Sequence, residues 1–337
     1  MGRYAGKSSS TTTNNISSLI QLAALGPATT VCDSCIYLTL FLSMATTNKL
    51  AKAFAKEDLS EQIQTLSHVL GASLAVGALL LVFIIFRGES LLATVIGPAG
   101  ATLSVEAARG AMKSIDLTPE VLRASLDYTR IRSAASPLLV MGMTSQAALL
   151  CAQDTRTPAL AVLVASVVNI VGDYFFVAKM RWGVRGAALA TTLASSLSNS
   201  LLLSEVWNMM NEWKNAYREM MKTGTSHEKD HCDPLSIPFI SFPDRKSLVS
   251  LLLLAGPMFF VMVGKINAYF AMTVRAGSFG MVALACHSVL TRIFFFLNTL
   301  GDALSQSAQS FLPGLFYRKK LLEAREEGSI SKVKVNE

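Results

Sequence analysis

The chain has 337 residues, of which 51% are hydrophobic and 16% charged, and its mean hydropathy is +0.43. Soluble globular domains usually carry about 25% charged residues, so this composition excludes an ordinary soluble domain and predicts a protein embedded in a lipid bilayer. The net charge of +7 is compatible with a nucleic-acid partner, but the basic residues are spread through polar loops, where Lys and Arg usually set membrane topology. We therefore expect no nucleic-acid partner.

Apolar stretches long enough to cross a bilayer recur along the chain, since a helix needs about 20 residues to span roughly 30 Å of hydrocarbon. They lie at residues 28–48, 64–86, 123–150, 159–178, 184–206, 248–275 and 281–313. We predict an all-α, polytopic membrane bundle of about seven transmembrane helices. Pro137, inside the third stretch, predicts a kink, because proline lacks the N–H that a helix interior needs.

Polar segments divide the predicted bundle into parts. The connection at residues 207–247 carries charges of both signs and is typical of a linker between a five-helix block and a two-helix block. The predicted parts are a polar N-terminal segment at 1–20, five spans at 21–206, the linker at 207–247, two spans at 248–316 and a polar C-terminal tail at 317–337.

Lys and Arg are more numerous in the loops on the side of the C-terminal tail than in the loops on the opposite side. The positive-inside tendency then places the tail inside and the N-terminus outside. An outside N-terminus with no signal peptide is unusual. We therefore expect that a helix preceding the first apolar stretch is missing from this sequence.

Two groups of potential metal ligands lack the rest of a metal site. The pattern "CDSC" at residues 32–35 opens an apolar stretch and has no second Cys pair. His227 and His231 lie near Cys232 in a polar loop, where nothing else fixes ligand geometry. Helix packing and a solvated loop explain these residues better, and we expect neither a metal nor another cofactor.

Two polar residues interrupt the fourth apolar stretch, in "LVASVVNIVGDYFFV". Asn169 and Asp173 share one helix face, and a carboxylate in hydrocarbon usually faces a partner or a watery cavity. Thr191, in the next stretch, lies at a similar depth from the same end, so we predict that the three residues meet. Asp173 is then either a proton carrier, because burial favours its neutral form, or a hydrogen-bonded contact that holds the two helices together.

Four stretches resemble helices of the multidrug and toxic compound extrusion (MATE) family of twelve-helix antiporters, and they follow the family order. They are "LAALGPATTVCDSCIYLTLFLSMATTNKLAKAFA" (22–55), "YTRIRSAASPLLVMGMTSQAALLCAQDTRTP" (128–158), "NIVGDYFFVAKMRWGVRGAALATTLAS" (169–195) and "ALACHSVLTRIFFFLNTLGDALSQSAQSFLPGLF" (283–316). Details such as "LAALGPATTVCD" and "GDALSQSAQSFLP" resemble the plant plastid-type subgroup. On this resemblance the seven stretches are family helices two to eight, and helix one and helices nine to twelve are absent from the sequence.

The resemblance implies roles for the polar residues. The family residues that match Asn169, Asp173 and Thr191 belong to a proton- or sodium-responsive site in the first lobe. In the family this site includes an Asp on helix one, which has no counterpart here. The resemblance therefore favours the carrier role of Asp173. It also implies alternating access between two six-helix lobes, of which only one is nearly whole here, so transport by this chain alone stays open.

Two basic residues are the candidate substrate-binding residues. Lys265 lies deep in the stretch 248–275, where many family members carry a Glu, so it reverses the local charge and favours an anionic substrate. The alternative is that Lys265 snorkels towards the outer surface. Arg292 in the last stretch is a candidate to bind the same carboxylate, or else it pairs with a lipid headgroup or Asp302.

We therefore expect a secondary active transporter, an antiporter that exports small organic compounds, anionic rather than cationic, in exchange for protons or Na⁺. The sequence has no G-x-x-x-x-G-K-[ST] loop, which disfavours ATP as the energy source, and no catalytic constellation that indicates an enzyme. The alternatives are a non-transporting MATE remnant, either truncated or completed by association with another chain, and a seven-helix receptor.

The expected location is a membrane, with the plastid envelope favoured over the plasma or vacuolar membrane. Two features favour the plastid: the subgroup resemblance, and the Ser- and Thr-rich residues 1–15, which contain no acid. If the chain is naturally this short, we expect it to form oligomers.

Overall fold

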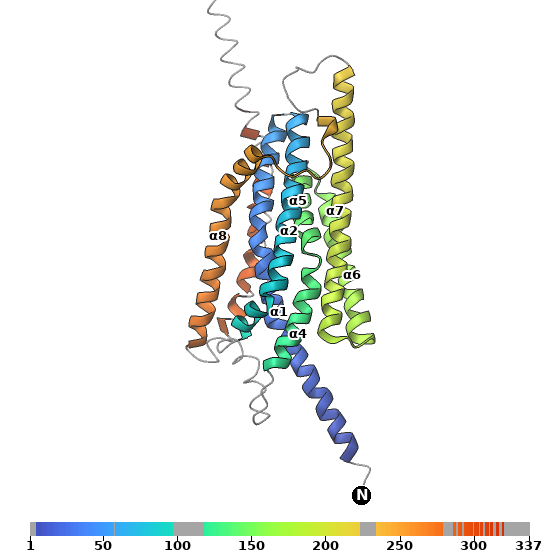
Figure 1. Cartoon of the computed structure of the whole chain (residues 1–337), viewed down its shortest axis with the longest axis vertical. Coiled ribbons are helices and arrows are strands. Elements are labelled where there is room, and N and C mark those ends of the chain that lie inside the picture. The colour runs from blue at the N-terminus through green and yellow to red at the C-terminus, as the bar shows by residue number, and fades with distance from the viewer. Residues whose placement is uncertain are drawn as a thin grey trace, which may run out of the picture.

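The computed structural model is a bundle of long helices that run along one axis (Figure 1). It describes residues 5–56, 58–96, 118–222 and 234–278, together with part of residues 286–319. Within these ranges there is no β-strand, and the predicted all-α class is confirmed. Among the described residues, four helices are long and apolar enough to cross a membrane, and one bent helix pair makes a fifth candidate.

α1 (Ala5–Ala55) and α2 (Leu59–Ile96) form an antiparallel pair joined by a short turn. The Asp58 carboxylate caps α2 by accepting hydrogen bonds from the amides of Ser60 (2.9 Å) and Glu61 (3.1 Å). The polar segment predicted at residues 1–20 is helical from Ala5 onward, and this first part of α1 projects from the bundle (Figure 1). The apolar part of α1, which is its candidate span, is Ala28–Ala55.

The predicted kink near Pro137 is confirmed. α4 (Thr118–Ser133) and α5 (Ser136–Cys151) meet at an angle of 51°. The Ser136 hydroxyl donates a hydrogen bond to the Gly77 carbonyl oxygen of α2 (3.0 Å), and a Cβ on Gly77 would lie 2.5 Å from the Pro137 Cα. α2 therefore passes directly against the break, which only a glycine at this point of α2 allows.

α6 (Arg156–Asp173) continues into a short π-helix, η1 (Tyr174–Lys179), and then turns into α7 (Gly183–Lys222). Arg181 and Gly183 in the turn have positive φ angles of 58° and 57°. α7 extends well beyond the predicted stretch 184–206, so the first part of the predicted linker is helical. Because α7 is rich in Ser and charged residues, it is not among the four apolar candidate spans.

The remaining chain contains η2 (Pro234–Ser236) and α8 (Arg245–Ser278), which packs mainly against α1. α8 agrees with the predicted stretch 248–275. The last predicted stretch, 281–313, lies only partly within the described residues, and those that are described there are helical.

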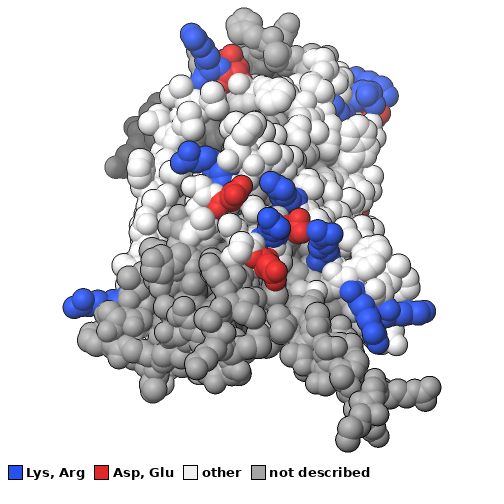
Figure 2. All heavy atoms as spheres, turned by 60° about the horizontal axis from the view of Figure 1, so that its bottom comes forward, with Lys and Arg blue, Asp and Glu red and all other residues white. Residues whose placement is uncertain are grey.

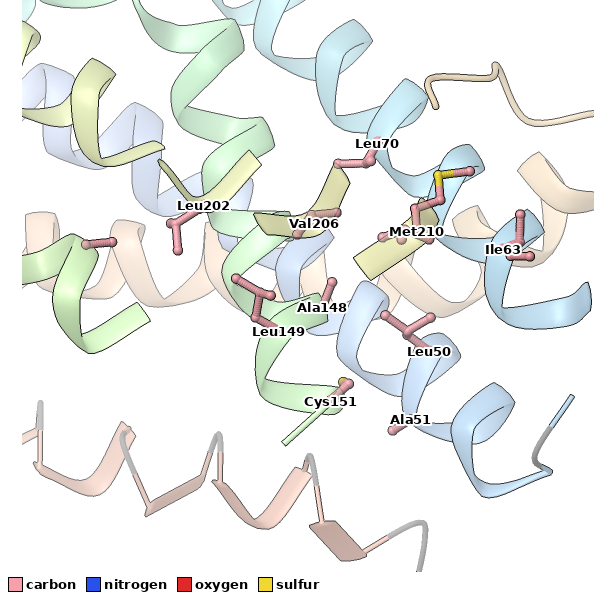
Figure 3. Close-up of a cluster of buried hydrophobic side chains, with 12 residues drawn as sticks. Leu50, Ala51, Ile63, Leu70, Ala148, Leu149, Cys151, Leu202, Val206 and Met210 are labelled. Carbon is pink, nitrogen blue, oxygen red and sulfur yellow. The ribbon is translucent and has the colours of Figure 1, made fainter. Parts of the chain in front are cut away.

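The main hydrophobic core lies near the turn between α1 and α2 (Figure 3). It is made by Leu50, Ala51, Ile63, Leu66, Leu70, Ala148, Leu149, Cys151, Ala161, Leu202, Val206 and Met210. We call the side of the bundle marked by Lys56 and Asp58 the α1–α2 end, and the opposite side, marked by residues 180–182, the α6–α7 end. Figure 2, which turns the α6–α7 end towards the viewer, shows charged side chains of both signs close together near the middle of the face, with further charged side chains near its edges.

Candidate functional site

The predicted polar residues of the fourth and fifth stretches lie at the contact between α6 and α7. α6 packs mainly against α7, and its other face exposes large apolar side chains such as Leu163 and Ile170, as expected of a helix that faces lipid. A Cβ on Gly172 would lie 2.9 Å from the Ala190 Cβ. This small residue lets the two helices approach closely, as is common between membrane helices.

The structure brings Asn169 and Thr191 together. The Thr191 hydroxyl lies 3.5 Å from the Asn169 side-chain oxygen and 3.0 Å from the Ala187 carbonyl oxygen. A hydroxyl has one hydrogen to donate, and the bond to Ala187 is the shorter one. The contact with Asn169 is therefore weak, at the upper limit of hydrogen-bond distance.

Asp173 lies one turn after Asn169 but shares no such bond. Its Oδ1 atom is buried and has no hydrogen-bond partner within the described part of the chain. A buried polar atom without a partner costs about 1–3 kcal/mol, and more when it is charged, so a native protein rarely retains one without a reason. The prediction that all three residues meet thus holds for Asn169 and Thr191, whereas no hydrogen bond joins Asp173 to either of them in the described chain.

The helix changes its winding directly after Asp173. η1 is a π-helix, a wide turn that is frequent at functional sites, and it runs from Tyr174 to Lys179. A Cβ on Gly186 of α7 would lie 3.0 Å from the Phe176 carbonyl oxygen in η1. This π-helix was not predicted, although Gly172 and Gly186 mark the places where α7 comes close to α6 and η1.

Lys265 points towards α1. Its ammonium nitrogen lies 5.4 Å from the centre of the Tyr37 ring, within the range of a cation–π interaction. This contact places the charge at the junction of α8 with α1. Arg292, the second predicted substrate residue, lies outside the described residues.

An ion pair between α1 and α4, with Arg132 largely buried and Asp33 exposed, was not predicted. An Arg132 guanidinium nitrogen lies 3.0 Å from a carboxylate oxygen of Asp33, and another donates a hydrogen bond to the Tyr128 hydroxyl (3.2 Å). Arg132 is 18% exposed and Asp33 is 62% exposed. The signal was present in the sequence, because Asp33 is an acidic residue inside an apolar stretch, the same observation that singled out Asp173.

Residues 10–175 match the MatE family. This part of the chain is a MatE family domain. The predicted MATE resemblance is thereby confirmed, and the alternative of a seven-helix receptor is wrong. MatE proteins are transporters, so family membership also confirms that this integral membrane protein is not an enzyme.

Relatives support the same assignment. The Arabidopsis thaliana protein DETOXIFICATION 47, chloroplastic, is 31% identical over 89% of this chain and 48% of its own length. DETOXIFICATION 44, chloroplastic, from the same plant is 27% identical over 59% of this chain and 33% of its own length. The chain therefore spans about half or less of the length of these relatives.

The fold agrees with solved MATE structures. A Vibrio cholerae MATE transporter, VcmN, superimposes with a TM-score of 0.67 over 90% of this chain and 60% of its own chain, at 19% sequence identity. At this low identity the similarity shows the fold alone.

Proposed function

We propose that the chain forms the first lobe, and the start of the second, of an antiporter that exports small organic anions in exchange for protons. Family membership supports transport. The observation that carries the coupling role is the buried Asp173 oxygen without a partner in the described chain. Protonation would remove the charge from this position, and deprotonation would restore it. The fraction of Asp173 that carries a proton would therefore differ between the two sides of a membrane with a proton gradient.

A proton suits this site better than Na⁺. Among the described residues, the Asp173 oxygen has no hydrogen-bonded neighbour, and the Thr191 hydroxyl is directed to Ala187 and Asn169. A cation needs several oxygen ligands arranged around it, whereas a proton needs only one basic atom.

The proposed preference for anions rests on Lys265. Its ammonium group lies 5.4 Å from the centre of the Tyr37 ring, at the contact of α8 with α1. A fixed positive charge at this junction attracts a carboxylate and repels an organic cation. Arg292 is a second proposed contact to the same group.

The proposed location is the plastid envelope, because DETOXIFICATION 47 carries the description "chloroplastic" and residues 1–15 are rich in Ser and Thr and contain no acid. The plasma and vacuolar membranes are the alternatives. Fractionation of plant cells that express the tagged chain, followed by immunodetection, distinguishes the three membranes.

The test of transport is reconstitution of the full chain in liposomes. The vesicles are loaded with carboxyfluorescein, an organic anion, or with ethidium, an organic cation, and a pH or Na⁺ gradient is applied. We expect the pH gradient to drive carboxyfluorescein flux, and Asp173→Asn to reduce this flux to background. Asp127→Asn is the matched control, because Asp127 forms an ion pair with Arg185 (2.7 Å) that is partly exposed to solvent.

Each component of the proposal has its own contradicting result. Unchanged flux in Asp173→Asn would show that Asp173 carries no proton. Flux driven by a Na⁺ gradient alone would show that Na⁺, not the proton, is the coupling ion. Flux of ethidium without flux of carboxyfluorescein would show that the transporter prefers cations. A folded wild-type chain with no flux of either dye would establish the non-transporting remnant instead.

A further inference from the structure

A cavity of about 280 Å³ lies at the α1–α2 end of the bundle, on the opposite side from Asp173. Three helices contribute polar side chains to its lining, which are Lys49 of α1, Glu61, Gln64, Thr65 and His68 of α2, and Ser247 and Ser250 of α8. Its volume is at the small end of the range for ligand pockets. The first block of helices and the start of the second therefore both contribute walls.

The rim of the cavity is held in place by the segment that leads into α8. The Ser67 hydroxyl donates a hydrogen bond to the Pro238 carbonyl oxygen (2.7 Å), and the Ser241 amide donates to the Ser67 carbonyl oxygen (3.3 Å). The Phe239 ring packs edge-to-face on Trp207 of α7, with the ring centres 4.8 Å apart. This segment continues to Pro243, which lines the cavity, so the cavity is part of a fixed structure.

The charges around the cavity favour a negative ligand. Glu61 is the one acidic lining residue, and its carboxylate forms an ion pair with Lys56 (2.6 Å). Lys49 has no carboxylate within 4.0 Å in the described chain, and its ammonium group donates only a long hydrogen bond to the Ser247 carbonyl oxygen (3.5 Å). Lys49 therefore brings a positive charge into the cavity that forms no direct ion pair with a described acid; Glu61, already paired with Lys56, acts on it only from a longer distance.

The other polar groups complete a binding site for an anion. Thr65, Ser247 and Ser250 have hydroxyl groups, and His68 has a ring nitrogen, which can donate hydrogen bonds to ligand oxygens. The deeper wall is apolar, because Val69 and Leu251 belong to a buried cluster with Leu42. An anionic oxygen bound beside Lys49 would thus be partly shielded from water, which strengthens its interaction with the ammonium group.

We propose that this cavity binds a small anionic group, a phosphate or a carboxylate, and that the bound anion joins α1 and α2 to the first turns of α8. The anion is either free in solution or the phosphate of a lipid headgroup. The site is separate from Asp173 and Lys265 and does not rest on the proposed transport function. Because the cavity has walls from both helix blocks, its occupancy stabilises one arrangement of these blocks over others.

The experiment measures the thermal unfolding of the full purified chain by tryptophan fluorescence. One arm titrates potassium phosphate in a neutral detergent, with potassium chloride at matched ionic strength as the reference. The second arm uses vesicles of phosphatidylcholine with or without phosphatidylglycerol. The variants are Lys49→Gln and, as a matched control, Lys52→Gln, which removes an exposed charge from the same helix outside the cavity.

We expect phosphate, phosphatidylglycerol or both to raise the unfolding temperature of the wild type and of Lys52→Gln. Lys49→Gln should weaken this binding about tenfold or more, since a hydrogen bond from a charged donor is lost. A second variant, Ser247→Leu, fills the cavity without removing Lys49 and should weaken binding equally. Circular dichroism of each variant shows whether it folds.

The two arms identify the source of the anion. An effect of phosphate in detergent that depends on Lys49 assigns the site to a free anion, and an effect of phosphatidylglycerol alone that depends on Lys49 assigns it to a lipid headgroup. No stabilisation of the wild type by either probe would overturn the proposal. Equal stabilisation of the wild type and both cavity variants would overturn it as well.

Discussion

The two ends of this bundle differ in how tightly their helices are packed. At the α1–α2 end, Leu50, Ile63 and Leu70 are fully buried, and the segment before α8 is hydrogen-bonded to α2. Towards the α6–α7 end, α6 rests mainly on α7, and a carboxyl oxygen of Asp173 is buried with no partner in the described chain. The first region behaves as a scaffold, whereas the second keeps an unfavourable group, as proteins usually do only at functional sites.

The largest expected effect is at the core of the scaffold. Leu70→Ala should lower the free energy of unfolding by about 2–5 kcal/mol, because it leaves a cavity among fully buried neighbours. Leu253→Ala in α8 is the control, since Leu253 is 73% exposed and its truncation should change stability by less than about 0.5 kcal/mol. Equilibrium unfolding in mixed micelles measures both. Equal losses would show that the α1–α2 end is no more tightly packed than the surface.

The next largest effect is expected at Gly71, where the segment that leads into α8 lies directly against α2. A Cβ on Gly71 would overlap the Ser241 carbonyl group, so Gly71→Ala should destabilise the protein by about 1–3 kcal/mol. Gly256 of α8 has nothing within 4 Å of its Cβ position. Gly256→Ala should therefore be neutral or stabilising by up to about 1 kcal/mol, because Ala favours the helix. Thermal unfolding of the two variants compares them, and the same sign for both would contradict this packing.

A smaller effect concerns the start of α6. The Asp154 carboxylate accepts hydrogen bonds from the amides of Arg156 (3.0 Å) and Thr157 (3.2 Å). Burial alone would raise the pKa of this carboxyl, but the bonds from Thr157 and Arg156 and the Arg156 charge outweigh it, so the pKa lies below its ordinary value. Asp154→Ala should cost about 0.5–2 kcal/mol of stability at neutral pH.

The lowered pKa determines how this cost depends on pH. The charged Asp154 stabilises the folded state above the ordinary Asp pKa of about 3.9, and this stabilisation is lost as the pH falls through the lower pKa of the folded state. Unfolding curves of the wild type and Asp154→Ala, measured from neutral to acidic pH, should therefore converge in acid. A difference that grows on acidification would have the wrong sign for a cap of this kind.

The smallest expected effect on stability is at the α6–α7 contact. Thr191→Val removes a weak contact to Asn169 and should cost about 0.6 kcal/mol or less. Thr192→Val is the matched control, because the Thr192 hydroxyl donates to the Ala188 carbonyl oxygen of its own helix (2.6 Å). If Thr191 belongs to the coupling site, only Thr191→Val shifts the pH dependence of dye flux in liposomes. The same shift in both variants would assign the effect to α7 as a whole.

The sequence predicted most of the helices and failed at their ends. The length of apolar stretches located the candidate spans in α1, α2, α6 and α8, and Pro137 located the bend between α4 and α5. Hydropathy gives no signal for the polar extensions of α1 towards Ala5 and of α7 to Lys222. A helix continues outside the hydrocarbon wherever its backbone bonds can form, and these bonds do not depend on apolar side chains.

The candidate site was predicted in part. The four-residue spacing of Asn169 and Asp173 correctly placed them on one helix face. The similar depth of Thr191 in the next span predicted its contact with Asn169, which the structure contains. That the Asp173 Oδ1 atom has no partner in the described chain was not predictable, because it depends on how the side chains of neighbouring helices pack around it. Asp33 was missed although it carried the same signal, since its partner Arg132 belongs to a helix distant in the sequence.

The sequence by itself determined that this is an all-helical membrane protein of the MatE family, because apolar length and local motifs are properties of single segments. Only the tertiary structure decided which charges are paired. Lys265 lies on Tyr37, Arg132 pairs with Asp33, and Lys49 opens into a cavity between α1, α2 and α8. The reason is physical: the free energy of a charge in a membrane protein depends on the neighbours and water around it, and packing between distant helices sets both.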